Sequence, residues 1–367
     1  MLSSIVFSTT YQCPIKCRYC GAECGPERTE RLSLRDMTDI IDKVYTYGKL
    51  ELVVFTGGEP FLLGKDLLKG VKYCTEKGLI TRIVTNAFWA KSPEIAKKTM
   101  RTYKDAGLTE INLSCDDYHQ EFIPLDNIKN ANEACIDVGL PCLIGHKMMK
   151  NYSLTLDSIE DFLGCKLTCF DPKKKNPDNN VISTGYTVPI AEDMHLIPDE
   201  EILYPNNDHC WKGPCTSLLQ RIIITPRKEL SICCGMVSRK VEEITFGTLD
   251  EYSLEELIVM AHKDLIVNWL ALEGPYGIMK YIQEKNPHIS FRQRYVNICH
   301  LCSEIFTRVE CREVLLEHAQ EKVMEISLER MLYDVMRTSE VIQNKIRSHK
   351  KSKKQATERG KEIETAN

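Results

Sequence analysis

Three closely spaced cysteines constrain this 367-residue chain more than any other feature. Cys13, Cys17 and Cys20 lie in the run Cys-Pro-Ile-Lys-Cys-Arg-Tyr-Cys. Iron–sulfur clusters are held by cysteine thiolates, usually four of them. Three thiolates at this spacing can hold three irons of a cubane [4Fe–4S] cluster and leave the fourth iron without a protein ligand. The spacing therefore predicts a cluster site that is built to bind a further molecule.

A zinc site is the alternative interpretation of the same cysteines. Cys24 follows Cys20 closely, and four cysteine thiolates are a common ligand set for structural zinc. Cysteine clusters in intracellular chains are often metal sites of one kind or another. Cys24 is then a zinc ligand, a further thiol near an iron–sulfur cluster, or a structural cysteine.

The composition and the sequence pattern argue against a nucleic-acid-binding, secreted or membrane-spanning protein. The 48 basic and 52 acidic residues nearly balance, which argues against bulk electrostatic binding of nucleic acid. The 17 cysteines are many, but the N-terminus lacks the pattern of a secretory signal and no apolar stretch is long enough to cross a membrane. We therefore expect a cytoplasmic protein whose clustered thiols are metal ligands rather than disulfides.

Short β-rich runs alternate with amphipathic helical patterns from the start to about Pro198. The predicted strands are Ser4–Ser8, Leu52–Phe55, Thr81–Thr85, Glu110–Ser114, Leu140–Lys147 and Val181–Val188. The predicted helices are Arg35–Tyr47, Lys65–Lys77, Pro93–Ala106, Leu125–Val138 and Leu156–Leu163. This alternation is typical of a parallel sheet with covering helices, in which functional residues gather after the carboxyl ends of the strands.

A glycine-rich motif follows the second predicted strand. It reads Thr56-Gly57-Gly58-Glu59-Pro60. Backbone without a Cβ can approach a ligand closely, and the Glu59 carboxylate can accept hydrogen bonds from an ammonium group. The same residues are also typical of a tight turn.

The two motifs, in this order and one strand apart, resemble the radical S-adenosylmethionine (SAM) superfamily. Its signature is CxxxCxxC with an aromatic residue before the last cysteine, here Tyr19. The resemblance implies that the open iron chelates the amine and carboxylate of SAM. An electron from the cluster then cleaves SAM into methionine and a 5′-deoxyadenosyl radical.

The resemblance also implies a set of SAM-binding residues. Tyr19 would lie against the cluster and the adenine, and Gly57, Gly58, Glu59 and Pro60 would hold the SAM amine. Asn86 belongs to a Thr-Asn-Gly-like element whose glycine is replaced here by Ala87, and Ser114 and Asp116 match a Ser-x-Asp element that bonds the ribose.

A second group of cysteines follows a predicted hairpin over Arg221–Cys234. Cys215, Cys233, Cys299 and Cys302, with Cys234 as a competitor for Cys233, come in an order that resembles the SPASM/twitch extension of radical SAM enzymes. That extension holds an auxiliary [4Fe–4S] cluster, and we expect one such cluster here. A zinc ribbon uses similar ligands and is the alternative.

These observations predict an α/β chain in four parts. Residues 1–200 form a partial (β/α)6 TIM-like barrel, and residues 206–312 form a small cysteine-rich α+β SPASM/twitch domain. A C-terminal helix over 313–346 and a disordered Lys-rich tail over 347–367 follow.

The resemblance implies a peptide or protein substrate, because SPASM/twitch enzymes mostly cross-link, epimerise or oxidise ribosomally made peptides. An epimerase needs a thiol that returns a hydrogen atom, and Cys234 is a candidate. An electron donor such as ferredoxin or flavodoxin is expected. Since the cysteine run begins at residue 13, no peptide-recognition domain is expected ahead of it.

Two other functions stay open. The chain is alternatively a radical SAM enzyme that acts on a small molecule or cofactor precursor. A hypothesis from another class is a zinc-stabilised binding protein, in which both groups of cysteines hold zinc.

Overall fold

The computed structural model describes residues 2–46, 49–170, 181–186, 202–207, 209–218, 220–233 and 241–336. The chain divides into two compact units, Met1–Leu316 and Glu317–Asn367. The sheet and the site described below belong to the first unit.

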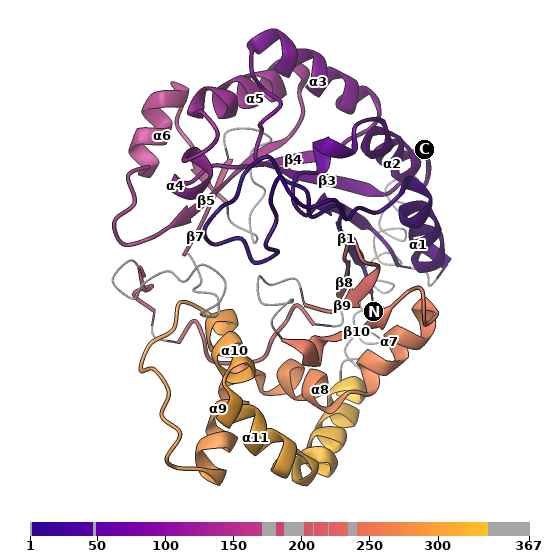
Figure 1. The fold of residues 1–367 in the computed structure, drawn as a ribbon, viewed down its shortest axis with the longest axis vertical. Helices are drawn as coiled ribbons and strands as arrows, with labels where there is room; N and C mark the ends of the chain where they lie inside the picture. The colour runs from indigo at the N-terminus through magenta and orange to yellow at the C-terminus, as the bar shows by residue number, and fades with distance from the viewer. Residues whose placement is uncertain are drawn as a thin grey trace, which may run out of the picture. The chain divides into compact units, whose positions relative to one another are not determined.

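A parallel sheet forms the centre of the first unit (Figure 1). Its parallel core runs in the order β1, β2, β3, β4, β5 and β7. These strands are Ser4–Ser8, Leu52–Thr56, Ile80–Thr85, Glu110–Ser114, Cys142–Met148 and Val181–Tyr186. The prediction of a parallel α/β core is confirmed. Thr187, Val188 and the polar stretch Asp171–Asn180 lie outside the described residues.

Helices follow the outer side of this sheet in Figure 1. The five predicted helices are present as α1 Leu34–Thr46, α2 Lys65–Glu76, α3 Pro93–Asp105, α5 Leu125–Val138 and α6 Leu156–Leu163. Local signals fix their ends: the Ser92 hydroxyl accepts a hydrogen bond from the backbone of Ile95 at the start of α3, and Gly139 ends α5 in the left-handed conformation.

Two short helices near the strand ends were not predicted. They are the 3-10 helix η1, Pro60–Leu63, and the single turn α4, Asp117–Gln120. Each is too short to show a hydrophobic period, and each begins at an acidic side chain that accepts a backbone hydrogen bond, Glu59 for η1 and Asp116 for α4.

The sheet continues from the parallel core into the second half of the chain. Strand β8, Arg221–Ile224, pairs in parallel with β1, so Ile222 lies opposite Ile5. Strand β9, Glu229–Ser231, forms the predicted hairpin with β8, and β10, Thr245–Thr248, follows it. The two-residue strand β6, Thr168–Cys169, lies beside β7 at the other edge. A boundary between domains at residues 200–206 stays a prediction.

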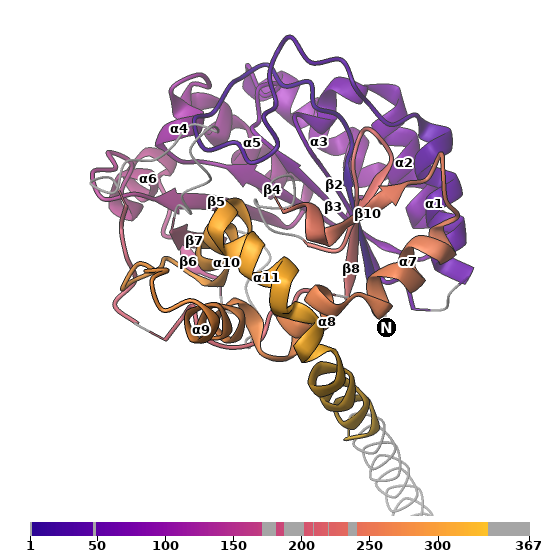
Figure 2. The same cartoon turned by 60° about the horizontal axis from the view of Figure 1, so that its bottom comes forward.

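Helices make up most of the chain after β10. They are α7 Leu254–Lys263, α8 Leu265–Leu272, α9 Gly274–Lys285, α10 Ile298–Thr307 and α11 Val309–His318, with the 3-10 turns η3 Glu242–Ile244 and η4 Ala319–Lys322. Both α8 and α10 pack against α9, as Figure 2 shows. In the second unit residues 323–336 are helical, and residues 337–367 lie outside the described part.

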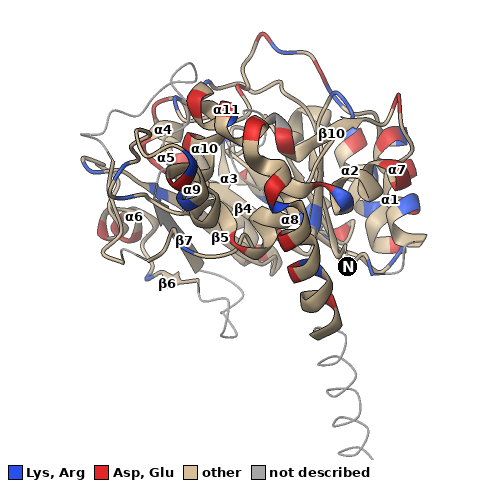
Figure 3. Cartoon of the chain, turned by 90° about the horizontal axis from the view of Figure 1, so that it is seen from below, with Lys and Arg blue, Asp and Glu red and all other residues tan. Residues whose placement is uncertain are grey.

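The described helices carry charges of both signs, as expected from the nearly equal numbers of acidic and basic residues. Acidic and basic residues are interspersed on the helices in the view of Figure 3. Within the part of the chain that the structure describes, no helix combines the length and the apolar character needed to cross a membrane.

A stacked pair of phenylalanines packs on the helix-covered face of the sheet. Phe7 of β1 and Phe55 of β2 are both 0% exposed, and their ring centroids lie 6.0 Å apart. Helix α2 approaches this pair through Gly70, where even an added Cβ would lie 3.5 Å from the Phe55 ring. The strands that end at the site are therefore fixed by a closely packed core.

We predict that Phe55→Ala lowers the free energy of unfolding by about 3–5 kcal/mol, because it leaves a cavity beneath α2. Ile80→Ala, at the 50% exposed first position of β3, is the matched control and should cost less than about 1 kcal/mol. Urea unfolding followed by circular dichroism measures both values. Equal losses in the two variants would contradict this account of the core.

Candidate active site

The three N-terminal cysteines line one cavity. Cys13 and Cys17 are 6% and 7% exposed, and Cys20 is half-buried. The cavity has a volume of about 370 Å³, which is within the range of small-molecule sites. Its lining includes the last residues of four neighbouring strands, Ser8, Thr56, Thr85 and Ser114. The cavity therefore lies at the carboxyl ends of β1 to β4, where parallel α/β folds place their sites.

The Gly-Gly motif packs directly on the loop that carries the cysteines. The backbone N–H of Gly58 donates to the carbonyl of Thr10 at 2.6 Å, and that of Glu59 donates to Gln12 at 2.9 Å. A Cβ on Gly58 would lie 2.1 Å from the Gln12 oxygen, and Gly57 has a φ of 124°. Both glycines also line the cavity. Close backbone approach thus requires glycine at both positions.

The Glu59 carboxylate lies behind the cavity wall rather than among its lining residues. Glu59 is 0% exposed, and its oxygens accept hydrogen bonds from the backbone of Phe61 at 3.1 Å, the Thr85 hydroxyl at 2.9 Å and the backbone of Asn86 at 3.0 Å. Burial raises the pKa of Glu59 to about 7. Pro60 follows as the first residue of η1. The carboxylate joins the loop after β2 to the end of β3, and direct binding of SAM by Glu59 stays a prediction.

Tyr19 is held by two polar side chains at the end of β4. Its hydroxyl lies 3.0 Å from Asp116 Oδ2 and 3.2 Å from His119 Nδ1, and the latter atom lies 2.9 Å from Asp116 Oδ1. Asp116 is 1% exposed and also caps α4. Tyr19, His119 and Ser114 line the cavity, whereas Asp116 is not among the lining residues and holds Tyr19 and His119 in place. The sequence signal of His119 is its position on the loop after β4, where a side chain can contact the substrate.

The surroundings shift the pKa values of the thiols in the N-terminal run in different directions. Burial raises the pKa of Cys13 to about 12 and also raises that of Cys17. Hydrogen bonding from the Cys24 side chain lowers the pKa of Cys20 to about 6. Cys24 is 2% exposed, and its backbone N–H donates to Cys20 Sγ at 3.5 Å. Metal binding holds coordinated thiols as thiolates, so this buried donor set fits a metal cluster.

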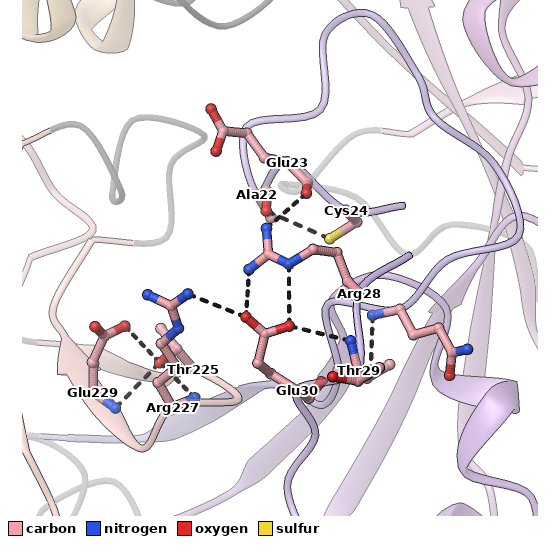
Figure 4. Close-up of polar contacts among 11 residues, drawn as sticks. Ala22, Glu23, Cys24, Arg28, Thr29, Glu30, Thr225, Arg227 and Glu229 are labelled. Carbon is pink, nitrogen blue, oxygen red and sulfur yellow. Dashed lines mark hydrogen bonds and ion pairs between the residues drawn. The ribbon is translucent and has the colours of Figure 1, made fainter. Parts of the chain in front are cut away.

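An ionic contact joins the cysteine loop to the β8–β9 hairpin (Figure 4). The Glu30 carboxylate accepts hydrogen bonds from Arg28 at 2.7 and 3.1 Å and from Arg227, in the hairpin turn, at 3.1 Å. Arg28 also donates to the carbonyl of Glu23 at 3.2 Å, and these donors hold the pKa of Glu30 well below its usual range. The loop after Cys20 is thus fixed against a hairpin about 200 residues away in the sequence.

The second group of predicted ligands also comes together. Burial raises the pKa of Cys302 well above its usual value, and the neighbouring thiols Cys233, Cys299 and Cys215 raise it further. Asn297 caps α10 by accepting hydrogen bonds from the backbone of Cys299 and His300, which places Cys299 and Cys302 on its first turns. Cys234 lies outside the described residues.

Comparison with known proteins agrees with this geometry. Residues 7–163 match the family model described as the Radical SAM superfamily. Residues 7–163 form a radical SAM domain. The match contains the three N-terminal cysteines, the Gly-Gly motif and the ends of β2 to β4. The predicted radical SAM signature is therefore confirmed.

The relatives differ in how much of the chain they resemble. YydG of Bacillus subtilis strain 168, which is named for peptide biosynthesis, is 22% identical over 313 residues, 82% of this chain and 90% of that protein. The PqqA peptide cyclase of Rhodopseudomonas palustris is 30% identical over 112 residues, 30% of this chain and 28% of the cyclase. The solved structure of native anSMEcpe with bound AdoMet and Cp18Cys peptide has a TM-score of 0.49 at 12% identity, covering 89% of this chain and 99% of that one.

We predict that Gly58→Ala lowers the free energy of unfolding by about 3 kcal/mol, because its Cβ must displace the Gln12 carbonyl. The iron content after anaerobic reconstitution should fall as well, since Gln12 precedes the first cysteine. Gly78→Ala is the matched control: its φ is 72° with nothing within 4 Å of the added Cβ, so it should cost only about 1 kcal/mol. A Gly58 variant that matches this control in stability and iron content would refute the packing argument.

Proposed function

We propose that this radical SAM enzyme is a peptide maturase, which abstracts a hydrogen atom from a peptide or protein substrate and thereby cross-links, epimerises or oxidises it. The observation that carries the proposal is the cavity at the strand ends, which is lined by Cys13, Cys17 and Cys20 and belongs to a chain that resembles YydG over most of its length.

The residues present fit a [4Fe–4S] cluster with SAM bound to its open iron. Cys13, Cys17 and Cys20 line the cavity together with Cys24, whose thiol donates to the backbone carbonyl of Ala22 at 3.7 Å and whose backbone N–H donates to Cys20 Sγ at 3.5 Å. When bound and reduced, the cluster and SAM supply a 5′-deoxyadenosyl radical. The protein binds and orients the reactants and excludes water.

The surrounding side chains have separate tasks in this proposal. Gly57 and Gly58 would let SAM approach the backbone, and Tyr19 and Ser114, which line the same cavity, would contact its adenosine. Asp116 fixes Tyr19 and His119 from behind. Glu59 holds the loops after β2 and β3 in position, because its carboxylate accepts hydrogen bonds from both.

A peptide substrate is supported by the relatives. YydG is named for peptide biosynthesis, and this chain spans 90% of its length. We propose in addition that a one-electron donor of the ferredoxin or flavodoxin type reduces the cluster in the cytoplasm. For an epimerisation, we propose Cys234 as the thiol that returns a hydrogen atom.

The primary test measures SAM cleavage by protein that is purified and reconstituted without oxygen. With SAM and dithionite, the wild type should form 5′-deoxyadenosine, detected by mass spectrometry, and Cys17→Ala should fall to the level of the enzyme-free control. Cys74→Ala, which removes a buried thiol from α2, should retain cleavage. A colourless, zinc-loaded wild type that leaves SAM intact would exclude the proposed chemistry.

The peptide substrate is tested by co-expression with a short open reading frame from the neighbourhood of the gene. A mass change in the encoded peptide, or uptake of solvent deuterium in an epimerisation, supports a maturase. An unmodified peptide, combined with SAM cleavage that is stimulated by a small molecule, would instead favour the alternative substrate class.

We also propose that Cys215, Cys233, Cys299 and Cys302 hold one auxiliary [4Fe–4S] cluster. The proximity of the four thiols supports this proposal. Cys215, Cys233 and Cys299 raise the pKa of buried Cys302, and only groups that lie close together interact in this way. Cys299 also packs against the apolar cluster that surrounds Cys13 and Cys17. A cluster here would therefore lie near the SAM cavity.

We predict that the wild type binds about eight irons per chain and that Cys302→Ala binds about four, because one of two [4Fe–4S] clusters loses a ligand. Iron and sulfide assays together with metal analysis measure the difference. Cys311→Ala, a buried cysteine of α11, is the matched control and should keep the wild-type content. One zinc per chain that disappears in the Cys302 variant would establish a zinc site instead.

A further inference from the structure

The side chain of Asn86 contacts one of the predicted cluster ligands. Its amide nitrogen Nδ2 lies 3.5 Å from Cys13 Sγ, which is within the range of an N–H···S hydrogen bond. Asn86 is 4% exposed and Cys13 is 6% exposed. The contact is therefore shielded from water, where a hydrogen bond to a charged acceptor has its largest effect.

The orientation of this amide is determined by its other end. Asn86 Oδ1 accepts a hydrogen bond from the backbone N–H of Phe88 at 3.0 Å. Turning the amide over would place its NH2 group against that N–H and its oxygen against the sulfur. Both contacts would then be lost, so the hydrogen-bond network assigns the donor to Cys13.

The buried Glu59 carboxylate holds Asn86 in this position. The backbone N–H of Asn86 donates to Glu59 Oε2 at 3.0 Å, and the Thr85 hydroxyl donates to Oε1 at 2.9 Å. The Thr85 oxygen in turn accepts from the backbone of Ala87 and from Trp89 Nε1, both at 3.1 Å. The Glu59 carboxylate and the Thr85 hydroxyl thus hold the loop after β3 in its conformation.

The backbone of the same loop is strained, so its conformation costs free energy. Ala87 has a φ of 60°, in the left-handed region where a residue with a Cβ pays roughly 1–2 kcal/mol. Asn127 on α5 donates to the carbonyls of Ala87 and Phe88 at 3.1 and 3.3 Å. Strain of this kind persists only where the surroundings over-determine the conformation.

We propose that Asn86 is a positioning residue for the cluster, whose amide donates a hydrogen bond to the Cys13 thiolate and makes the cluster easier to reduce. Hydrogen bonds to the sulfurs are among the factors that set cluster potentials, and they favour the reduced form because it carries more negative charge. This proposal rests on the proposed function and adds a role for Asn86 that differs from contact with SAM.

The test compares the wild type with Asn86→Ala and Asn86→Asp, reconstituted anaerobically as full-length protein. Asn86→Ala removes the donor. Asn86→Asp keeps an acceptor for Phe88 but places a carboxylate against the sulfur. Asn130→Ala is the matched control, because Asn130 donates to the carbonyl of Ala90, in the same loop, at 3.0 Å. Electron paramagnetic resonance at a fixed, poised potential measures the ratio of reduced to oxidised cluster, and the signal that responds to SAM identifies the cluster concerned.

We expect the ratio to fall about threefold to tenfold in Asn86→Ala and further in Asn86→Asp, where tenfold corresponds to 59 mV for a one-electron couple. Asn130→Ala should match the wild type. Unchanged ratios at wild-type iron and sulfide content would overturn the proposal. A change in SAM affinity alone would also overturn it and leave Asn86 as a SAM ligand.

A measurement on the wild type covers the case in which the variants fail to assemble a cluster. Protein labelled with 15N at the asparagine side-chain amide should show a hyperfine coupling to the reduced, SAM-responsive cluster in electron–nuclear double resonance. Absence of that coupling contradicts the contact. A wild type without SAM cleavage would refute the proposed function, whereas cleavage combined with no coupling would refute only the role of Asn86.

Discussion

The buried residue Glu59 connects three of the loops that form the active site. The backbone N–H of Glu59 donates to the carbonyl of Gln12, next to the first cysteine. Its side-chain oxygens accept hydrogen bonds from the start of η1 and from the end of β3. A carboxylate that is 0% exposed has to be satisfied by such donors, because each unpaired group would cost free energy in a dry interior. The positions of the cysteine loop and of Asn86 therefore depend on one another.

The second half of the chain is attached to this centre by two kinds of contact. Strand β8 pairs with β1, which supplies the edge of β1 with hydrogen-bond partners, and the hairpin turn after β8 reaches Glu30 through Arg227. The same turn reaches α1, because Lys228 pairs with Asp36 at 3.3 Å. The loop that follows Cys20 is thus bonded to the hairpin that leads to Cys233, so the two groups of cysteines share structural support.

Most of the parallel core could be predicted because its signals are local. The runs around Val53 and Ile111 are β-rich and bounded by turn residues, and helices such as α5 show the apolar period of a covered face. The single turn α4 has no period, since it forms only where Asp116 accepts from the backbone of His119. The contact of Arg227 with Glu30 has no local signal at all, because the two residues are 197 positions apart.

The sequence by itself determined which atoms are available: three thiols at cluster spacing, a Gly-Gly pair and strands that end beside them. Their spacing along the chain is sufficient for this, because ligand chemistry depends on residue type and short-range geometry. The tertiary structure decided how those atoms are used. It buried Glu59 behind the wall of the cavity, placed Asp116 against Tyr19 and directed the Asn86 amide at Cys13. These contacts depend on the tertiary structure because hydrogen bonds in a closely packed interior join residues that are distant in the sequence.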